Sequence, residues 1–158
     1  MRYVEIGEFI DPRPYLAVLP LFADHLPPQA RAFAVDPAHY DFSSRRCVKD
    51  LFVRHVAWAD SGGEEGLSLT LLLGANPWRH DDDLLLRYTG VRVARVELSD
   101  TPPPGPQRLG SVIMDELLPT QDGCLHELAF FGGDIVVHCS DVAATWVLTS
   151  ALSNQPSA

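Results

Sequence analysis

The chain has 158 residues, of which 46% are hydrophobic and 21% are charged, a composition typical of a folded domain with its own core. Twelve basic and 21 acidic residues give a net charge of −9. An acidic surface repels nucleic acid backbones and anionic lipids, so this charge disfavours nucleic acid and membrane partners and favours a basic protein partner. The same charge could instead serve only to keep the protein in solution.

The charge is unevenly distributed along the chain. Residues 1–60 contain 7 basic and 8 acidic groups, whereas residues 61–158 contain 5 and 13, a net charge of −8. Charge concentrated in this way steers a cationic partner toward one part of a protein and makes association sensitive to salt. We therefore expect the binding surface to lie in the second part of the chain.

Cysteine usage and the absence of long apolar runs bear on location. Three cysteines, Cys47, Cys124 and Cys139, cannot all form disulfides within one chain. Acidic residues interrupt the opening stretch MRYVEIGEFIDPRP, which does not resemble a signal peptide. No apolar run reaches the roughly 18 residues of a membrane-spanning helix. We expect a cytoplasmic protein with reduced thiols.

The proline-rich residues 1–45 are predicted to pack as a segment on the rest of the domain. Helical spacing predicts short helical turns at roughly 13–19 and 29–34, the first ended by Pro20, because proline lacks a backbone donor and clashes one turn back. Residues 1–10 alternate and could form an edge strand. Residues 46–152 then form an antiparallel β domain, and 153–158 a flexible tail.

Alternating apolar residues predict a hairpin from residues 50–60 and 67–73, joined by the loop SGGEEG. Within 84–98 the apolar phase changes. Either a β-bulge near Ala94–Arg95 keeps the apolar residues on one face, or the chain crosses from one sheet to another.

The last third predicts a meander of strands at 110–119, 124–131 and 135–140, followed by a strand or short helix within 141–152. With Gly132-Gly133 as a two-residue turn, Phe131 faces Asp134 and His126 faces Cys139. We therefore predict an α+β, β-rich fold: antiparallel strands in two packed sheets or one bent sheet, with short N-terminal helices.

The stretch His80–Asp83 raises the question of a metal site. Its spacing does not match a calcium loop, and adjacent strand residues point to opposite faces, so a solvated acidic rim is the favoured interpretation. We expect this rim and the loop at 61–66 to bind a basic partner, with Trp78 as an aromatic anchor. The predicted contact residues are Glu64, Glu65, Trp78, Asp81, Asp82 and Asp83.

The predicted hairpin register also suggests a zinc site. Cys124, His126 and Cys139 share one face, with Asp141 opposite Cys124 as a possible fourth ligand. The same face carries apolar residues, so both cysteines could instead be small core residues and His126 a histidine with satisfied hydrogen bonds. The sequence predicts no other cofactor.

Other catalytic signals are weak. Glu127 and His138, opposed in the predicted register, could exchange protons or could simply add a cross-strand contact. Asp115 and Glu116 are adjacent and so point to opposite faces, which is poor geometry for a catalytic pair. The chain also lacks a G-x-S-x-G elbow and the phosphate-binding glycine patterns. We expect a protein that is not an enzyme.

Four segments in this order resemble small uncharacterised bacterial domains of the kind found among toxin-immunity partners: CVKDLFVRHVAW, LLLRYTGV, LGSVIMDEL and LHELAFFGGDIVVHCSDV. The resemblance covers about residues 46–146. The related pattern reads His-Asp where this chain has Lys49-Asp50, so no histidine role carries over to that position.

The resemblance implies a compact fold and an immunity-type inhibitor that masks a basic partner such as a toxin. Two alternatives remain: a metal-binding enzyme or sensor built on Cys124, His126 and Cys139, and a structural homodimer that uses an exposed sheet edge.

Overall fold

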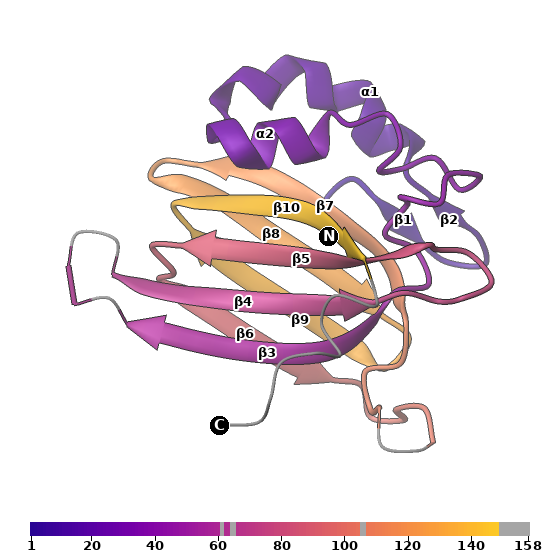
Figure 1. Ribbon diagram of the computed structural model, residues 1–158. Helices are drawn as coiled ribbons and strands as arrows, with labels where there is room; N and C mark the ends of the chain where they lie inside the picture. The colour runs from indigo at the N-terminus through magenta and orange to yellow at the C-terminus, as the bar shows by residue number, and fades with distance from the viewer. Residues whose placement is uncertain (61, 64–65, 105–106, 149–158) are drawn as a thin grey trace.

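The computed structural model describes residues 1–60, 62–63, 66–104 and 107–148, and it shows the β-rich α+β fold that the sequence predicts, with two four-stranded antiparallel sheets (Figure 1). The first sheet has the order β10 (Asp141–Leu148), β5 (Asp82–Thr89), β4 (Leu67–Gly74) and β3 (Phe52–Asp60). The second has the order β6 (Val93–Leu98), β9 (Gly133–Cys139), β8 (Gly123–Phe130) and β7 (Val112–Thr120). The segment after Asp141 is thus a strand, and the predicted tail 153–158 lies outside the described residues.

One face of each sheet contributes to a single core. Leu69, Leu71 and Leu73 alternate along β4 and are buried, in the pattern that predicted the β3–β4 hairpin. Ile135 and Val137 of β9 belong to the same cluster of buried side chains. The two sheets therefore bury their apolar faces together, as period-2 alternation requires of strands with one solvated face.

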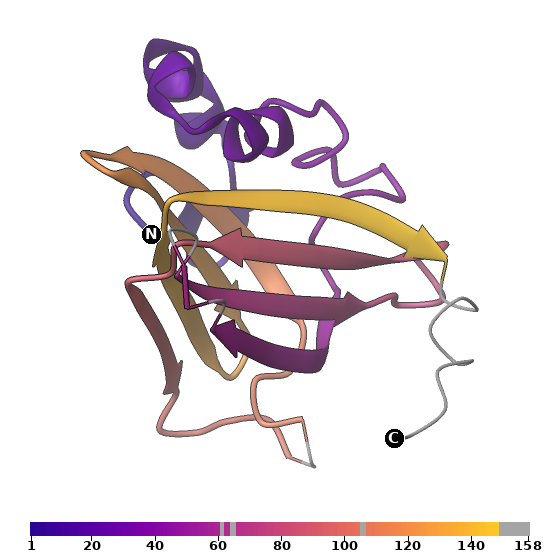
Figure 2. The same ribbon diagram turned by 60° about the vertical axis from the view of Figure 1, so that its left-hand side comes forward.

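The N-terminal segment lies over one edge of this pair of sheets. It consists of β1 (Glu5–Ile6), β2 (Ile10–Asp11), α1 (Arg13–Phe22), a 3-10 turn η1 (Ala23–His25) and α2 (Pro28–Ala34). Figures 1 and 2 show the helices beside β10 and β7, whereas β3 and β6 form the opposite edge. Residues 1–10 do not join either large sheet, because β1 pairs with β2.

Helix α1 continues through Pro20, so the predicted end of this helix is wrong by about one turn. Pro20 lies three residues from the end of the helix, where it removes a single backbone hydrogen bond. Leu19 is buried, and the N–H of Ala23 donates to the Leu19 carbonyl. The burial of Leu19 and the hydrogen bond from Ala23 to Leu19 stabilise the helical turn that follows the proline.

The chain crosses between the two sheets directly after β5. Gly90 has a φ of 57°, a left-handed conformation that favours glycine, and it begins the short link to β6. The pairing of β6 with β9 is regular from Val93 to Leu98, without a bulge at Ala94–Arg95. Of the two readings of the phase change, the crossing is confirmed and the bulge is wrong.

The predicted register of the β8–β9 hairpin is displaced by two residues. Phe130 pairs with Gly133 and Cys124 pairs with Cys139, so the turn consists of Phe131 and Gly132. Because side chains alternate with period 2, a slip of two residues leaves the two faces correctly assigned and changes every cross-strand partner.

No helix in the described ranges is both long enough and apolar enough to cross a membrane.

Candidate functional site

The predicted acidic rim is only partly a surface. Asp83 is buried, where its carboxylate accepts hydrogen bonds from the Arg54 guanidinium at 2.7 Å and the Ala75 N–H at 2.8 Å. His80 is also buried, and it accepts from the Asn76 N–H through Nδ1. These two residues therefore anchor the loop before β5 and contribute nothing to an exposed acidic surface.

Of the remaining rim residues, Trp78 and Asp81 are exposed, whereas Asp82 is half-buried with its Oδ1 atom out of contact with solvent. Trp78 is 91% exposed, and Asp81 forms an exposed ion pair with Arg45. The segment containing Trp78 follows the C-terminal end of β4, whereas Gly66, a described residue of the β3–β4 loop, precedes its N-terminal end, so the two lie at opposite ends of that strand (Figure 1). Glu64 and Glu65 lie outside the described residues.

The observed register removes the arrangement that the zinc hypothesis required, in which His126 lies directly across from Cys139. Cys124 faces Cys139, with 3.6 Å between the two sulfur atoms, and both side chains are buried. Both ring nitrogens of His126 have other partners, as described below. Among the residues with described positions, no group of three or more His, Cys, Asp or Glu side chains is arranged to hold a metal ion.

Asp141 does not face Cys124, because it pairs with Thr89 at the start of β10. Its carboxylate instead accepts hydrogen bonds from Gln29 and Ala30 in the first turn of α2. An acceptor there satisfies N–H groups that lack a partner within the helix. Asp141 therefore joins the N-terminal segment to the first sheet.

The slip also separates the predicted acid–base pair. Glu127 faces Val136, and His138 faces Leu125. The Glu127 carboxylate contacts the amino group of Met1 instead. The geometry thus assigns Glu127 to the contact between the second sheet and the N-terminal segment.

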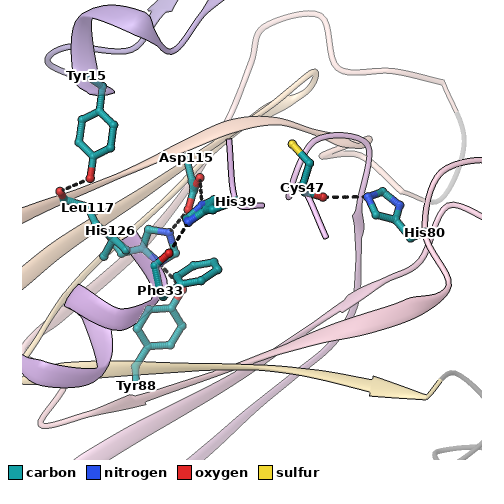
Figure 3. A network of polar contacts seen from close by, with 9 residues as sticks. All are labelled: Tyr15, Phe33, His39, Cys47, His80, Tyr88, Asp115, Leu117 and His126. Atoms are coloured by element: carbon teal, nitrogen blue, oxygen red, sulfur yellow. Dashed lines mark hydrogen bonds and ion pairs between the residues drawn. The ribbon is translucent and has the colours of Figure 1, made fainter. Parts of the chain in front are cut away.

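The densest polar cluster is a buried chain of four side chains from four different parts of the fold (Figure 3). Asp115 of β7 lies between two histidines: Oδ1 is 2.7 Å from His39 Nε2, and Oδ2 is 2.8 Å from His126 Nε2. His126 Nδ1 is 2.8 Å from the Tyr88 hydroxyl on β5. His39 Nδ1 is 2.8 Å from the carbonyl oxygen of Phe33.

The hydrogen-bond partners fix the protons in this cluster. A carbonyl oxygen only accepts, so His39 donates through Nδ1 to Phe33. With Asp115 ionised, His39 also donates through Nε2 and is an imidazolium. His126 donates through Nε2 to Asp115 and accepts the Tyr88 proton at Nδ1, which leaves it neutral. In this buried ion pair each ring N–H and the Tyr88 hydroxyl proton thus has an acceptor.

The electrostatics of Asp115 follow from these neighbours. Burial by itself raises the pKa of a carboxyl group, but the charge of His39 and the hydrogen bonds from both histidines outweigh burial and hold the pKa of Asp115 well below its usual range. None of these side chains reaches the surface. The cluster therefore joins His39 to both sheets and has no access for a substrate.

A second buried carboxylate holds the first residues of the chain. Glu116 accepts hydrogen bonds from three successive backbone N–H groups, those of Arg2, Tyr3 and Val4, at 2.7 to 2.8 Å. Three charge-assisted bonds on one carboxylate make a rigid anchor. Adjacent Asp115 and Glu116 point to opposite faces as predicted, and both bind the N-terminal segment.

A hollow in the described surface lies between the β1–β2 hairpin and residues 40–42, with a volume of about 720 Å³. We call it the acidic cleft. Its lining comprises Glu5, Gly7, Glu8, Phe9, Ile10, Asp11, Pro12, Arg13, Tyr40, Asp41 and Phe42. Four carboxylates and one guanidinium thus surround a partly aromatic hollow.

The charge of the cleft persists at neutral pH. A hydrogen bond from the Arg13 side chain lowers the pKa of Asp11 to about 2, and the two groups form an ion pair at 2.7 Å. Hydrogen bonds from Ser43 lower the pKa of Asp41. One guanidinium stands against four carboxylates, so the cleft keeps an excess of negative charge that faces solvent.

Aromatic side chains complete the cleft. Phe9 is 79% exposed, so most of its apolar ring is available at the surface of the cleft. Tyr40 is buried beneath, and its ring lies 4.0 Å from that of His39. The cleft is thus fixed from below by the buried Asp115 cluster.

The sequence did not reveal this cleft, because its residues come from two segments, 5–13 and 40–42, that meet only in the fold. The signal was the set of acidic residues in the opening stretch, which we used only to exclude a signal peptide. No family model matches the chain, and no curated protein matches its sequence.

Proposed function

We propose that this protein is a protein-binding domain that recognises a cationic segment of a partner protein in the acidic cleft. The observation that carries the proposal is the combination, in one hollow of about 720 Å³, of four carboxylates with exposed aromatic rings. Lysine and arginine side chains fit such a site because carboxylates pair with their charge and aromatic faces attract cations.

The charge and the exposed apolar surface of the cleft predict how binding depends on salt. Long-range attraction between the acidic protein and a basic partner accelerates encounter, and salt screens it within about 10 Å at 0.1 M. Phe9, which is largely exposed, gives a partner an apolar surface to bury. Binding should therefore weaken with salt without being abolished by it.

The finer proposal is an immunity-type inhibitor that masks a basic toxin, the function that the resemblance described above implies. A cleft that takes a cationic segment suits this role, because a toxin that acts on an anionic target exposes basic residues at its own site. The buried position of the Asp115 cluster favours binding over catalysis, since its ionised groups only connect elements of the fold.

A labelled arginine-rich peptide tests the cleft directly. Binding is measured by fluorescence anisotropy in low salt for the wild type, for the double variant Glu5→Gln/Glu8→Gln, and for the control Asp100→Asn/Asp122→Asn. Both variants remove two exposed negative charges, but only the first removes them from the cleft. We expect the cleft variant to weaken binding about fivefold, the effect of losing two surface ion pairs, and the control to weaken it less than twofold.

Equal weakening by both double variants would contradict the proposal, since the peptide would then respond to net charge alone. The same three proteins then serve as baits for a partner in a low-salt lysate. A basic protein retained by the wild type and the control, but lost with the cleft variant, is the partner that the proposal predicts.

A further inference from the structure

Within the described residues, strand β6 is an open edge of the second sheet with apolar side chains exposed along it. β6 has β9 as its neighbour and stands at the end of the strand order. All six residues of the strand are exposed, with Val96 at 60% and Leu98 at 53%. A hollow of about 420 Å³, lined in part by Val53, Val96, Leu98 and Leu109, lies beside it. An edge of this kind is a template for pairing with another strand.

The backbone of β6 is oriented for such pairing. In an antiparallel sheet, the N–H and C=O groups of one residue both point to the strand on one side, and those of the next residue point to the other side. The N–H of Ser99 donates to the Gly132 carbonyl at 2.9 Å, so every second residue back from Ser99 also faces β9. The backbone groups of Ala94, Val96 and Leu98 therefore point to the open side.

We propose that two copies of this chain pair through β6, antiparallel about a two-fold axis at Val96. This register joins the outward backbone groups of Val96 to those of its own copy. It also joins the groups of Ala94 to those of Leu98 on the second copy. The two second sheets then form one continuous eight-stranded sheet.

Charge selects this register. With Val96 opposite its own copy, Arg95 lies directly across from Glu97 of the second copy, and the symmetric pair forms as well. Within one chain the same two side chains already pair at 3.0 Å on the solvent face of the strand. A shift of one strand by two residues keeps the outward backbone groups paired. In one direction it places Arg95 opposite Arg95 of the second copy, and in the other it places Glu97 opposite Glu97, and both like-charge pairs are unfavourable.

Apolar contact adds to the charge pairing. Val96 pairs with Ile135 of β9, so it lies on the face of the sheet that carries the core, together with Ala94 and Leu98. These side chains are nevertheless exposed in a single copy. Pairing brings them against the same residues of the second copy, which reduces their contact with water.

The interface is small, so the association should be weak. One strand from each copy lies at the low end of specific interfaces, about 1,200 Å². We expect a dissociation constant in the micromolar range, visible only when concentration is varied. None of the residues that line the acidic cleft belongs to β6, so dimerisation leaves the cleft open and is independent of the proposed binding function.

Sedimentation velocity from low-micromolar to submillimolar concentrations, combined with a charge exchange, tests the proposal. Arg95→Glu places two glutamates across the interface, and Glu97→Arg places two arginines there, so each single variant should weaken dimerisation about tenfold or more. The double variant Arg95→Glu/Glu97→Arg restores both pairs at unchanged net charge and should restore the dimer. Far-UV circular dichroism checks that all four proteins are folded.

A wild type that stays monomeric at every concentration would overturn the proposal and leave the edge for a strand of a different protein. A dimer that the charge exchange does not disturb would overturn it too, because another surface would then hold the copies together. The arginine-rich peptide should bind the single variants within about twofold of the wild type, as expected for the control Asp100→Asn/Asp122→Asn, so failure of the dimer and failure of the cleft are separate outcomes.

Discussion

At the scale of single residues, the most informative side chains of this protein are buried polar ones. Asp115 and Glu116 follow each other in β7, yet one carboxylate binds two histidines and the other binds three backbone N–H groups. The sequence correctly predicted that they point to opposite faces. It could not predict their partners, because His39 lies 76 positions from Asp115 and Arg2 lies 114 positions from Glu116. His126 is only 11 positions from Asp115, but it does not lie directly across from it, since Asp115 pairs with Leu128.

Asp115→Asn should lower the free energy of unfolding by about 3 kcal/mol at neutral pH, because it leaves a buried imidazolium at His39 without its counter-charge. Chemical denaturation measures the loss. Asp122→Asn, an exchange at an exposed site, is the control and should change stability by less than about 0.5 kcal/mol. Equal stability of the two variants would contradict the ion pair.

The pH dependence of the same variant gives a second check. The folded-state pKa of Asp115 lies below the value of about 3.9 expected in the unfolded chain. Its ionised form therefore contributes stability that is fully present above about pH 4 and is lost as the pH falls toward the folded-state pKa. Between pH 5 and pH 3 the wild type should lose more stability than Asp115→Asn.

The three thiols should be unreactive in the folded protein. Burial raises the pKa of Cys47 to about 11, and the hydrogen bond with the Cys139 thiol, together with burial, raises the pKa of Cys124. Since the thiolate is the reactive form, an aromatic disulfide reagent at pH 8 should label no cysteine before denaturation and all three afterwards. Rapid labelling of the native protein would contradict this arrangement.

At the scale of elements, the sequence predicted the types of strand and helix better than their exact pairing. Period-2 alternation identified both faces of the β8–β9 hairpin. The turn was predicted at Gly132-Gly133, because two glycines are typical of a two-residue turn, but it lies at Phe131 and Gly132. Gly133 serves another purpose: a Cβ there would lie 1.9 Å from the carbonyl oxygen of Glu97 on β6. A glycine required by a neighbouring strand is indistinguishable, in sequence, from one required by a turn.

Gly90→Ala should be markedly destabilising, because this residue carries the crossing between sheets. A Cβ there would meet the Ser140 hydroxyl at 2.2 Å, in addition to the strain of a φ of 57°. Gly62→Ala is a matched control, since Gly62 has a φ of 62° and open space around it. We expect about 1 kcal/mol of destabilisation for the control and about 1–3 kcal/mol more for Gly90→Ala, measured by thermal unfolding.

At the scale of the whole molecule, the predicted division into an N-terminal segment and a β domain describes two parts of one core. Tyr15 and Phe33 belong to the same buried cluster as the strands, and His39 completes the Asp115 pair. The distribution of charge was also misleading, since Asp83, Asp115 and Glu116 of the acidic second part are buried. Burial of a charge depends on the fold and is not visible in a count of residues.

Removal of residues 1–45 should therefore abolish cooperative folding. The shortened chain would expose the core faces of β7 and β10 and leave Asp115 with a single histidine. Calorimetry should show one two-state transition for the full chain and none for the fragment. A fragment that unfolds cooperatively at a similar temperature would show that residues 1–45 are a separate unit.

The bond from Asp141 to the first turn of α2 also constrains the order in which a newly made chain can complete its fold. Gln29 leaves the ribosome 112 residues before Asp141. At about 5–20 residues per second, translation of that interval takes roughly 6 to 22 s. During this time α2 lacks both its acceptor and the strand that it covers, whereas the β3–β4 hairpin can form as soon as it emerges. Docking of the first helices therefore depends on the last strand, and a ribosome that stalls before β10 would hold a chain with its core open.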